Sequence, residues 1–263
     1  MYLAPLDYDR FFKKVFSDTG ISKRFLEDFL ERKIEAIEKK ENKHKITDAA
    51  KYIEFDFRCT LDDKTNIIVD MQQWYKADVP QRFYLYHTLN TALQLETLPT
   101  KKLMKEEVPN KVTVVSDYRN LMPVYTIIWM GDDSLGFKDK DYMSYKMNPK
   151  ELDDFIKNDT LWNKNNLEIL KKERAELIEI MGNKTKNIDF ISNNHLIFLF
   201  QKNIVKNKKL SKVLKWFEFA ERTKNQKNTK EDFKDFIGED VFDEMIRRLN
   251  VSELTEEDIE YID

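Results

Sequence analysis

The sequence predicts an α/β protein with the element order αβββαβ in its first half and a mixed central sheet. Apolar residues recur at helical spacing over residues 9–32 and again over 81–96, and strand-like segments lie between these two helices. Residues 123–130 then form a continuous apolar run ending at Gly131, which is typical of a strand buried on both faces. The chain has only five glycines and six prolines, so we expect long regular elements.

The expected elements of the first half end in a strand–turn–strand unit and a helix. In chain order they are a helix over 9–32, a strand over 33–39, a charged linker over 40–45, strands Tyr52–Arg58 and Asn66–Gln72, a helix over 81–96, a short strand over 112–115 within the polar connection 97–120, and the buried strand over 123–130.

The second half is expected to be mostly helical. Residues 150–190 have helical periodicity that stops at Gly182, and residues 232–249 form an amphipathic pattern. The short apolar run 196–200 is expected to be a strand. We therefore divide the chain into a core over 1–147 and a mostly helical region over 148–263, which returns one strand, 196–201, to the core.

Composition excludes several classes of protein. A chain of 263 residues can bury one sizeable core, or a core with an appended lobe. The single cysteine, Cys59, has no partner for an internal disulfide, which fits a reducing compartment. The sequence has neither a signal-peptide pattern nor an apolar run that would span a membrane, so we expect a cytoplasmic protein with no membrane partner.

Charge is unevenly distributed along the chain. The net charge of −3 gives no overall attraction to nucleic acid. Residues 202–215 nevertheless contain six lysines and no acid, whereas acidic residues dominate from Glu231 onward. The lysine-rich stretch is either a DNA-binding surface or an exposed helix face, and the acidic residues either dock on it or remain solvated.

Three polar side chains on the strand–turn–strand unit are the candidate catalytic residues. Asp70 and Gln72 point to one face of their strand because side chains alternate. If the pairing is centred on Asp63 of the turn, Asp56 lies directly opposite Asp70, and both carboxylates reach one hard cation. A register shifted by one residue separates them.

A purely structural role for these aspartates is less favoured by the sequence than a role in metal binding. An aspartate in a strand is commonly a solvated outward residue, but Asp56 lies between Phe55 and Phe57, and Asp70 follows three apolar residues. A buried carboxylate must pair, bind a proton or bind a metal ion. We therefore expect a metal site here.

Other charged residues have two readings each. Asp9 precedes apolar residues at helical spacing, which indicates the N-cap of the first helix. Lys13 and Lys14 either contact DNA phosphates or form a solvated helix face. Arg82 is the stronger phosphate-binding candidate, because it opens a helix just after Pro80 and offers bidentate geometry.

These motifs together resemble the PD-(D/E)XK nuclease superfamily, in its branch of family transposases and recombination-promoting nucleases, where Gln replaces the motif lysine. The resemblance covers residues 1 to about 130. It is supported by three further stretches: Asp9–Phe16, Arg82–Tyr86 and Leu121–Ile128, with a weaker similarity at His195–Gln201 and Leu214–Phe217. The branch usually has Glu-x-Gln, whereas this chain has Asp70-Met71-Gln72, which draws a bound ion closer to the strand.

The resemblance implies a restriction-endonuclease-like fold and a set of functional residues. Asp56, Asp70 and the backbone carbonyl of Met71 would hold Mg²⁺, for which Mn²⁺ would substitute, and Asp9 would complete the metal shell. Gln72 cannot accept a proton at neutral pH, so it would orient water or a phosphate oxygen.

Two functions from different classes follow. The first is a metal-dependent DNA endonuclease that hydrolyses phosphodiester bonds, linked to recombination or mobile elements. The second is an inactive nuclease-fold protein that serves as a DNA-binding or assembly module. An enzyme that cleaves RNA alone is a third option, and a homo-oligomer is compatible with either of the first two.

Overall fold

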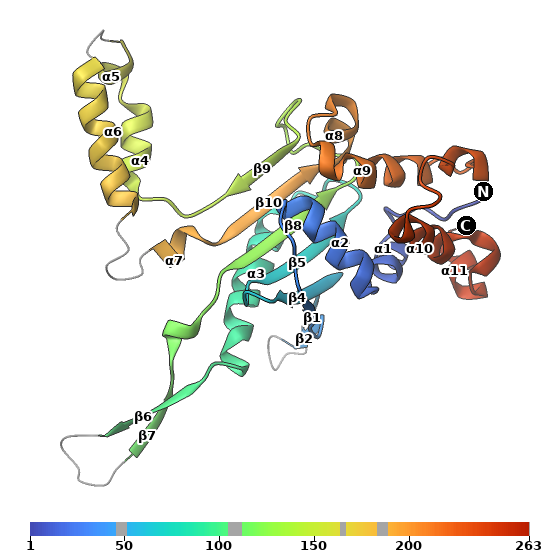
Figure 1. Ribbon diagram of the computed structural model, residues 1–263, viewed down its shortest axis with the longest axis horizontal. Helices are drawn as coiled ribbons and strands as arrows, with labels where there is room; N and C mark the ends of the chain where they lie inside the picture. Colours follow the sequence, from blue (N-terminus) through green and yellow to red (C-terminus); the bar gives the residue numbers. More distant parts are fainter. Residues whose placement is uncertain (46–51, 105–111, 164–166, 183–188, 263) are drawn as a thin grey trace. The chain divides into compact units, whose positions relative to one another are not determined.

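The computed structural model describes residues 1–45, 52–104, 112–163, 167–182 and 189–262. The chain divides into two compact units (Figure 1). The sheet unit comprises Met1–Ser144 and Leu196–Asp263, and the helical unit comprises Tyr145–His195. The C-terminal helices belong to the same unit as the N-terminal half. The predicted division into a core over 1–147 and a mostly helical region over 148–263 stays a prediction.

The centre of the sheet unit is a six-stranded mixed sheet, which confirms the predicted fold class. Its strand order is β1-β4-β5-β8-β10-β9, with β4 antiparallel and β8 parallel to β5. The predicted strands over 123–130 and 196–200 are both present. The bounds are β1 Ile37–Lys39, β4 Phe57–Leu61, β5 Asn66–Gln72, β8 Val124–Met130, β9 Tyr142–Tyr145 and β10 His195–Phe200.

The register of the central hairpin, which the sequence left open, is the one that opposes Asp56 and Asp70. Phe57 pairs with Val69 and Thr60 with Asn66, so the pairing is centred on Asp63. The Asp63 carboxylate accepts the Thr65 N–H (2.9 Å) and closes the turn. Continuing the same register brings Asp56 opposite Asp70.

The expected strand Tyr52–Arg58 is broken at the candidate catalytic residue. β3 (Tyr52–Glu54) pairs with β2 (Lys43–Lys45) in a separate two-stranded sheet, and β4 starts only at Phe57. The break arises because the Phe55 N–H donates to the Asn42 carbonyl and the Asn42 amide donates to the Asp56 carbonyl. The charged linker predicted over 40–45 thus contains a strand.

The predicted helix over 9–32 is two helices, α1 (Asp9–Phe16) and α2 (Thr19–Leu30). Asp18 separates them, because its carboxylate caps α2 by accepting the N–H groups of Gly20 and Ile21. Both helices pack their apolar faces on one side of the sheet in the main core. Core members from these helices are Phe11, Phe12, Val15, Phe16, Ile21, Phe25 and Leu26.

The opposite face of the sheet is covered by α3 (Val79–Ala92), which continues into a 3₁₀ turn, η1 (Leu93–Glu96), and confirms the helix predicted over 81–96. Val79 and Phe83 of α3 form a second core with alternate residues of β8 and β10. β8 is therefore buried on both faces, as its continuous apolar sequence predicts.

The connection between α3 and β8 contains an antiparallel pair, β6 (Thr100–Met104) and β7 (Val112–Ser116), followed by the 3₁₀ turn η2 (Tyr118–Asn120). The strand predicted over 112–115 is confirmed. β6 was not predicted, because its Lys101-Lys102 pair interrupts any apolar pattern.

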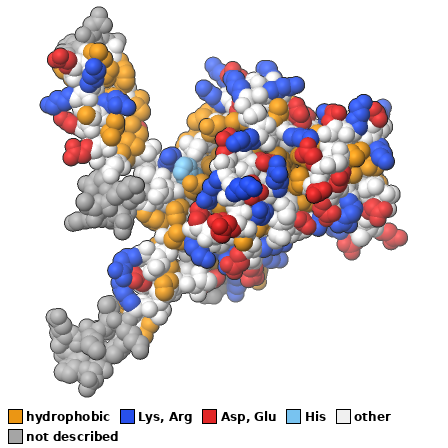
Figure 2. All heavy atoms as spheres, viewed as in Figure 1, with side chains coloured by type: hydrophobic (Ala, Val, Ile, Leu, Met, Phe, Trp, Pro, Cys, Tyr) orange, Lys and Arg blue, Asp and Glu red, His pale blue; other side chains and the backbone are white. Residues whose placement is uncertain are grey.

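The helical unit consists mainly of helices, as predicted for residues 150–190. Its helices are α4 (Lys150–Lys157), α5 (Asp159–Asn163), α6 (Leu167–Gly182) and α7 (Asp189–Ser192), and α6 ends at the predicted Gly182. Figure 2 shows hydrophobic side chains along one side of this unit.

The C-terminal part of the sheet unit packs on the N-terminal helices. The helix predicted over 232–249 begins only at Asp240, since Gly238 has a φ of 94° and interrupts the helical path. The bounds are α8 Gln201–Asn207, α9 Ser211–Thr223, η3 Lys230–Phe233, α10 Asp240–Leu249, η4 Val251–Glu253 and α11 Glu256–Glu260.

The contacts of the lysine-rich stretch agree with an exposed helix face, whereas DNA binding by these lysines stays a prediction. α9 buries Trp216 and Phe217 in the main core, so it is an amphipathic helix. On its exposed side Lys212 pairs with Glu31, and Lys215 pairs with Glu239. One acidic segment therefore docks on the basic stretch. Within the described ranges, no helix is long and apolar enough to cross a membrane.

Candidate functional site

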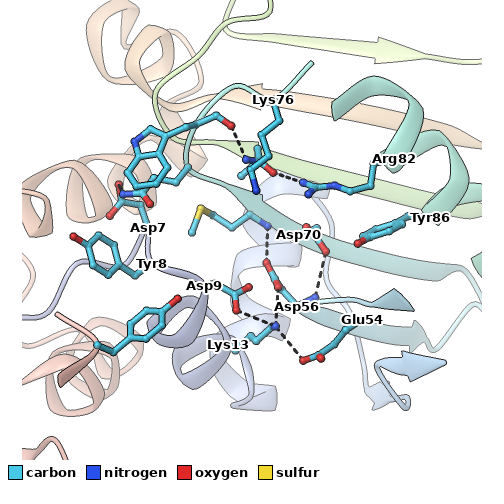
Figure 3. Close-up of a pocket in the computed structure, with 15 residues that line it drawn as sticks. Asp7, Tyr8, Asp9, Lys13, Glu54, Asp56, Asp70, Lys76, Arg82 and Tyr86 are labelled. Carbon is cyan, nitrogen blue, oxygen red and sulfur yellow. Dashed lines mark hydrogen bonds and ion pairs between the residues drawn. The ribbon is translucent and has the colours of Figure 1, made fainter. Parts of the chain in front are cut away.

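A polar cavity of about 460 Å³ lies at the carboxyl end of β5 (Figure 3). The cavity is lined by residues from the N-terminal segment, α1, β3, the link between β3 and β4, β5 and its following loop, α3 and the C-terminal segment. Its lining is Asp7, Tyr8, Asp9, Lys13, Glu54, Asp56, Asp70, Met71, Gln72, Gln73, Trp74, Lys76, Arg82, Tyr86 and Tyr261. All four predicted catalytic residues are among them.

Asp56 and Asp70 are linked by reciprocal hydrogen bonds where the β4–β5 ladder ends. The Met71 N–H donates to Oδ2 of Asp56 (2.8 Å), and the Asp56 N–H donates to Oδ2 of Asp70 (3.3 Å). The side chains replace the backbone pairing at this point. Because Asp56 is 6% exposed and Asp70 is 5% exposed, both carboxyl groups are nearly removed from bulk water.

The two carboxyl groups titrate abnormally. Burial raises the pKa of Asp56 well above its usual range, and the neighbouring charges of Asp70 and Asp9 raise it further. Burial likewise raises the pKa of Asp70, to about 7, against the opposing effects of the Asp56 N–H and of Arg82. The ionised form of the pair is therefore unfavourable, because nearby positive charge does not fully compensate for burial. A cation bound between the two carboxylates would stabilise that ionised form.

Lys13 of α1 supplies part of that charge. Its ammonium lies 3.1 Å from Asp9, 3.0 Å from Glu54 and 3.6 Å from Asp56 (Figure 3). Burial favours the neutral amine, but these three carboxylates outweigh it and raise the pKa of Lys13. Lys13 is thus a charged member of the site at neutral pH.

Asp9 is not a helix cap. The N-cap of α1 is Tyr8, no side chain caps this helix, and Asp9 is the first helical residue. Its carboxylate is turned toward Lys13 and Asp56 instead. Glu54 was not predicted from the sequence, although its position two residues before Asp56 on a strand was a usable signal.

Gln72 connects the end of β5 to Arg82 and to the following loop. Its amide nitrogen donates to the Trp74 carbonyl (2.5 Å), and its amide oxygen accepts from Arg82. The Arg82 guanidinium also lies over the ring of Phe83, 4.6 Å from its centroid. Gln72 therefore positions Arg82. The sequence did not predict this contact between the two side chains.

Lys14 is directed away from the cavity. Its ammonium donates to Asp258 of α11 (2.6 Å), which also accepts from Arg10 (2.5 Å). Of the two adjacent lysines only Lys13 lines the cavity, because successive helical residues point in different directions.

A second acidic group borders the same cavity. Asp7 is 4% exposed, accepts from the amide of Gln73 (3.3 Å) and lies 4.0 Å from Lys224. Its Oδ1 atom is buried and has no hydrogen-bond partner among the described residues. Lys224 also pairs with Asp132 (2.7 Å), so this lysine joins α9 to the end of β8. Asp7 was not identified from the sequence, although it precedes Asp9 by two residues.

The residues present fit a hard divalent cation. The part of the chain that is described has no group of three or more His, Cys, Asp or Glu side chains arranged around a metal position. Two buried carboxylates are nonetheless sufficient for Mg²⁺, which keeps several water ligands. The cavity lining contains no histidine or cysteine, and the Lys13 ammonium already shows that a cation is held among these oxygens.

Comparison with known proteins gives a family match within the first half of the chain. The family model of the PD-(D/E)XK nuclease family transposases matches residues 6–127, which contain every motif residue of the cavity from Asp9 to Arg82. No curated protein and no solved structure matched the chain. The family match supports a nuclease-like role related to recombination or mobile elements, with DNA as the substrate that the family implies. Residues 6–127 of this chain therefore match the PD-(D/E)XK nuclease family transposases, a family that implies the restriction-endonuclease-like fold seen in the mixed sheet.

Proposed function

We propose that the protein is a divalent-metal-dependent DNA endonuclease that hydrolyses phosphodiester bonds. The observation that carries the proposal is the pair of nearly buried carboxyl groups, Asp56 and Asp70, facing a polar cavity within the family-matched segment. Burial without full charge compensation destabilises the fold, and such an arrangement is typical of a functional site.

Asp56, Asp70 and the Met71 carbonyl would hold Mg²⁺, with Mn²⁺ as a substitute, because all three offer oxygen ligands. When bound, the ion lowers the pKa of a coordinated water and polarises the scissile phosphate. Asp9 lies beside Asp56 and would support the same shell from α1.

Lys13 and Arg82 would supply the positive charge that a lysine at position 72 would otherwise provide. Arg82 is held by Gln72, and its fork geometry suits a phosphate oxygen. Lys13 stays protonated among the carboxylates, so it acts as a charge and not as a base. Gln72 is a positioning residue in this scheme. Lys14 would not contact DNA, because its ammonium is bound to Asp258 of α11.

Nicking of supercoiled plasmid by purified protein tests the proposal. We expect cleavage with Mg²⁺ or Mn²⁺, none with chelator, and loss of cleavage in Asp70→Asn. Lys23→Gln, which alters a surface pair on α2, is the matched control and should cleave normally. Equal cleavage by wild type and Asp70→Asn would assign the activity to a contaminant, and no cleavage with any ion would refute the proposal.

One observation favours the alternative of an inactive nuclease-fold module. Lys13 already pairs with the carboxylates, and both ends of the Gln72 amide are occupied. An inactive module would bind DNA without cleaving it, and divalent ions would leave its melting temperature unchanged. The same plasmid assay, run with a DNA-binding measurement, separates the two functions. A cytoplasmic location and a homo-oligomeric state stay predictions.

A further inference from the structure

The loop after β5 presents two aromatic side chains to solvent beside the candidate catalytic cavity. Trp74 is 60% exposed and Tyr75 is 55% exposed. Trp74 also lines the cavity that holds Asp56 and Asp70. Tryptophan is highly buried on average, so a tryptophan this exposed at a site is informative.

The exposure of these rings does not come from a loosely held backbone. The Gln72 amide donates to the Trp74 carbonyl, the Gly131 N–H donates to the Gln72 carbonyl (2.9 Å), and the Asp132 N–H donates to the Gln73 carbonyl (3.1 Å). The loop is therefore pinned to the end of β8. Within the described residues, neither ring pairs with another aromatic ring or with a cation.

Positive charge lies next to the rings. Lys76 lines the cavity, and Figure 3 shows its side chain extending into it. Its ammonium forms no ion pair or hydrogen bond with any described residue. An aromatic surface beside unpaired positive charge is the combination by which proteins bind single-stranded nucleic acid, with bases stacked on rings and phosphates on cations.

A duplex cannot use these rings in the same way. In double-stranded DNA the base faces are stacked inside the helix, so a ring at the surface meets only sugars and phosphates. An unpaired base next to the scissile phosphate has a free face, and stacking on it covers the exposed indole.

We propose that Trp74 forms a stacking platform for an unpaired base, so that the site takes DNA that is single-stranded beside the cleaved phosphate. The inference rests on the proposed function, because it names the substrate form of the same site. Trp74 selects the substrate by binding the base, and Lys76 with Arg82 holds the backbone.

The test is fluorescence anisotropy of a labelled DNA oligonucleotide and of its duplex, with chelator present so that no cleavage occurs. We expect wild type to bind the single strand more tightly than the duplex. Trp74→Ala should weaken single-strand binding roughly 5- to 150-fold, the loss expected for one stacked base, and leave duplex binding unchanged. Trp74→Phe should restore most of the affinity.

Trp162→Ala is the matched control, because Trp162 is 53% exposed but does not line the cavity. It should bind both DNA forms as wild type does. Equal weakening of single strand and duplex by Trp74→Ala, or no weakening, would overturn the platform. Tighter binding of the RNA of the same sequence would overturn DNA as the substrate.

Failure of this inference is distinguishable from failure of the proposed function. Binding is measured without a divalent ion, so a normal Trp74→Ala variant refutes the platform and says nothing against cleavage. Absence of ion-dependent nicking in the wild type refutes the endonuclease and leaves the binding measurement valid.

Discussion

Replacing Asp70 by asparagine should make the metal-free protein more stable at neutral to alkaline pH while destroying its candidate metal site. The asparagine side chain would keep the shape of the aspartate, and its oxygen would still accept the Asp56 N–H. What disappears is a charge in a nearly water-free position. The variant therefore isolates the electrostatic cost of the site from its packing.

The magnitude follows from the pKa of Asp70, which burial raises from 3.8 to about 7. A carboxyl group with a raised folded-state pKa destabilises the fold progressively as pH rises from its unfolded to its folded pKa. Each pH unit in that window is worth about 1.4 kcal/mol, so ionised Asp70 costs up to roughly 4 kcal/mol at pH 8. In a protein of this length that corresponds to roughly 8 to 16 °C in melting temperature.

Thermal unfolding of wild type and Asp70→Asn at about pH 4 and pH 8, with chelator, measures this effect. We expect similar stabilities at the acidic pH and a more stable variant at the alkaline pH. Saturating Mg²⁺ should then stabilise only the wild type, by about 2.7 kcal/mol at one hundred times the dissociation constant.

Asp63→Asn, in the turn of the same β4–β5 hairpin, is the control, because its stability at alkaline pH should change in the opposite direction. Partial burial raises the pKa of Asp63, but hydrogen bonds from Thr65 and Arg32 outweigh it and lower the pKa overall. This variant should be less stable than wild type at alkaline pH, because a lowered folded pKa stabilises above the unfolded pKa. An Asp70→Asn variant that is destabilised equally at both pH values would refute the reasoning.

Three further predictions concern other parts of the molecule. Lys13→Gln should destabilise the metal-free protein and abolish nicking, since three carboxylates lose their common cation; normal nicking by this variant would remove Lys13 from the site. Phe12→Ala should lower the free energy of unfolding by about 3 to 5 kcal/mol in denaturant titration, because Phe12 is fully buried and stacks on Phe16 (4.3 Å between centroids). Gly238→Ala should cost about 1 kcal/mol in the same titration through backbone strain at a φ of 94°. Apart from its chain neighbours, no described residue has a heavy atom within 4 Å of the added methyl group. An unchanged variant would show that this turn relaxes.

Local sequence patterns determined much of the sheet and of its helical covers. A strand, a polar turn and a second strand in succession predicted the β4–β5 hairpin, although the register that opposes Asp56 and Asp70 was left open. The continuous apolar run of β8 likewise specified a strand with two buried faces. These properties depend on neighbours close in the chain, which is why they are readable from sequence.

Contacts between distant segments were decided only by the tertiary structure. Lys13 reaches Glu54 and Asp56 because α1 packs its phenylalanines on the sheet, and Arg82 reaches Gln72 because α3 crosses the other face. The break at Asp56 depends on Asn42, fourteen residues earlier. A periodic pattern specifies which face of an element is buried, but the partner that meets a polar side chain depends on how packed elements are oriented.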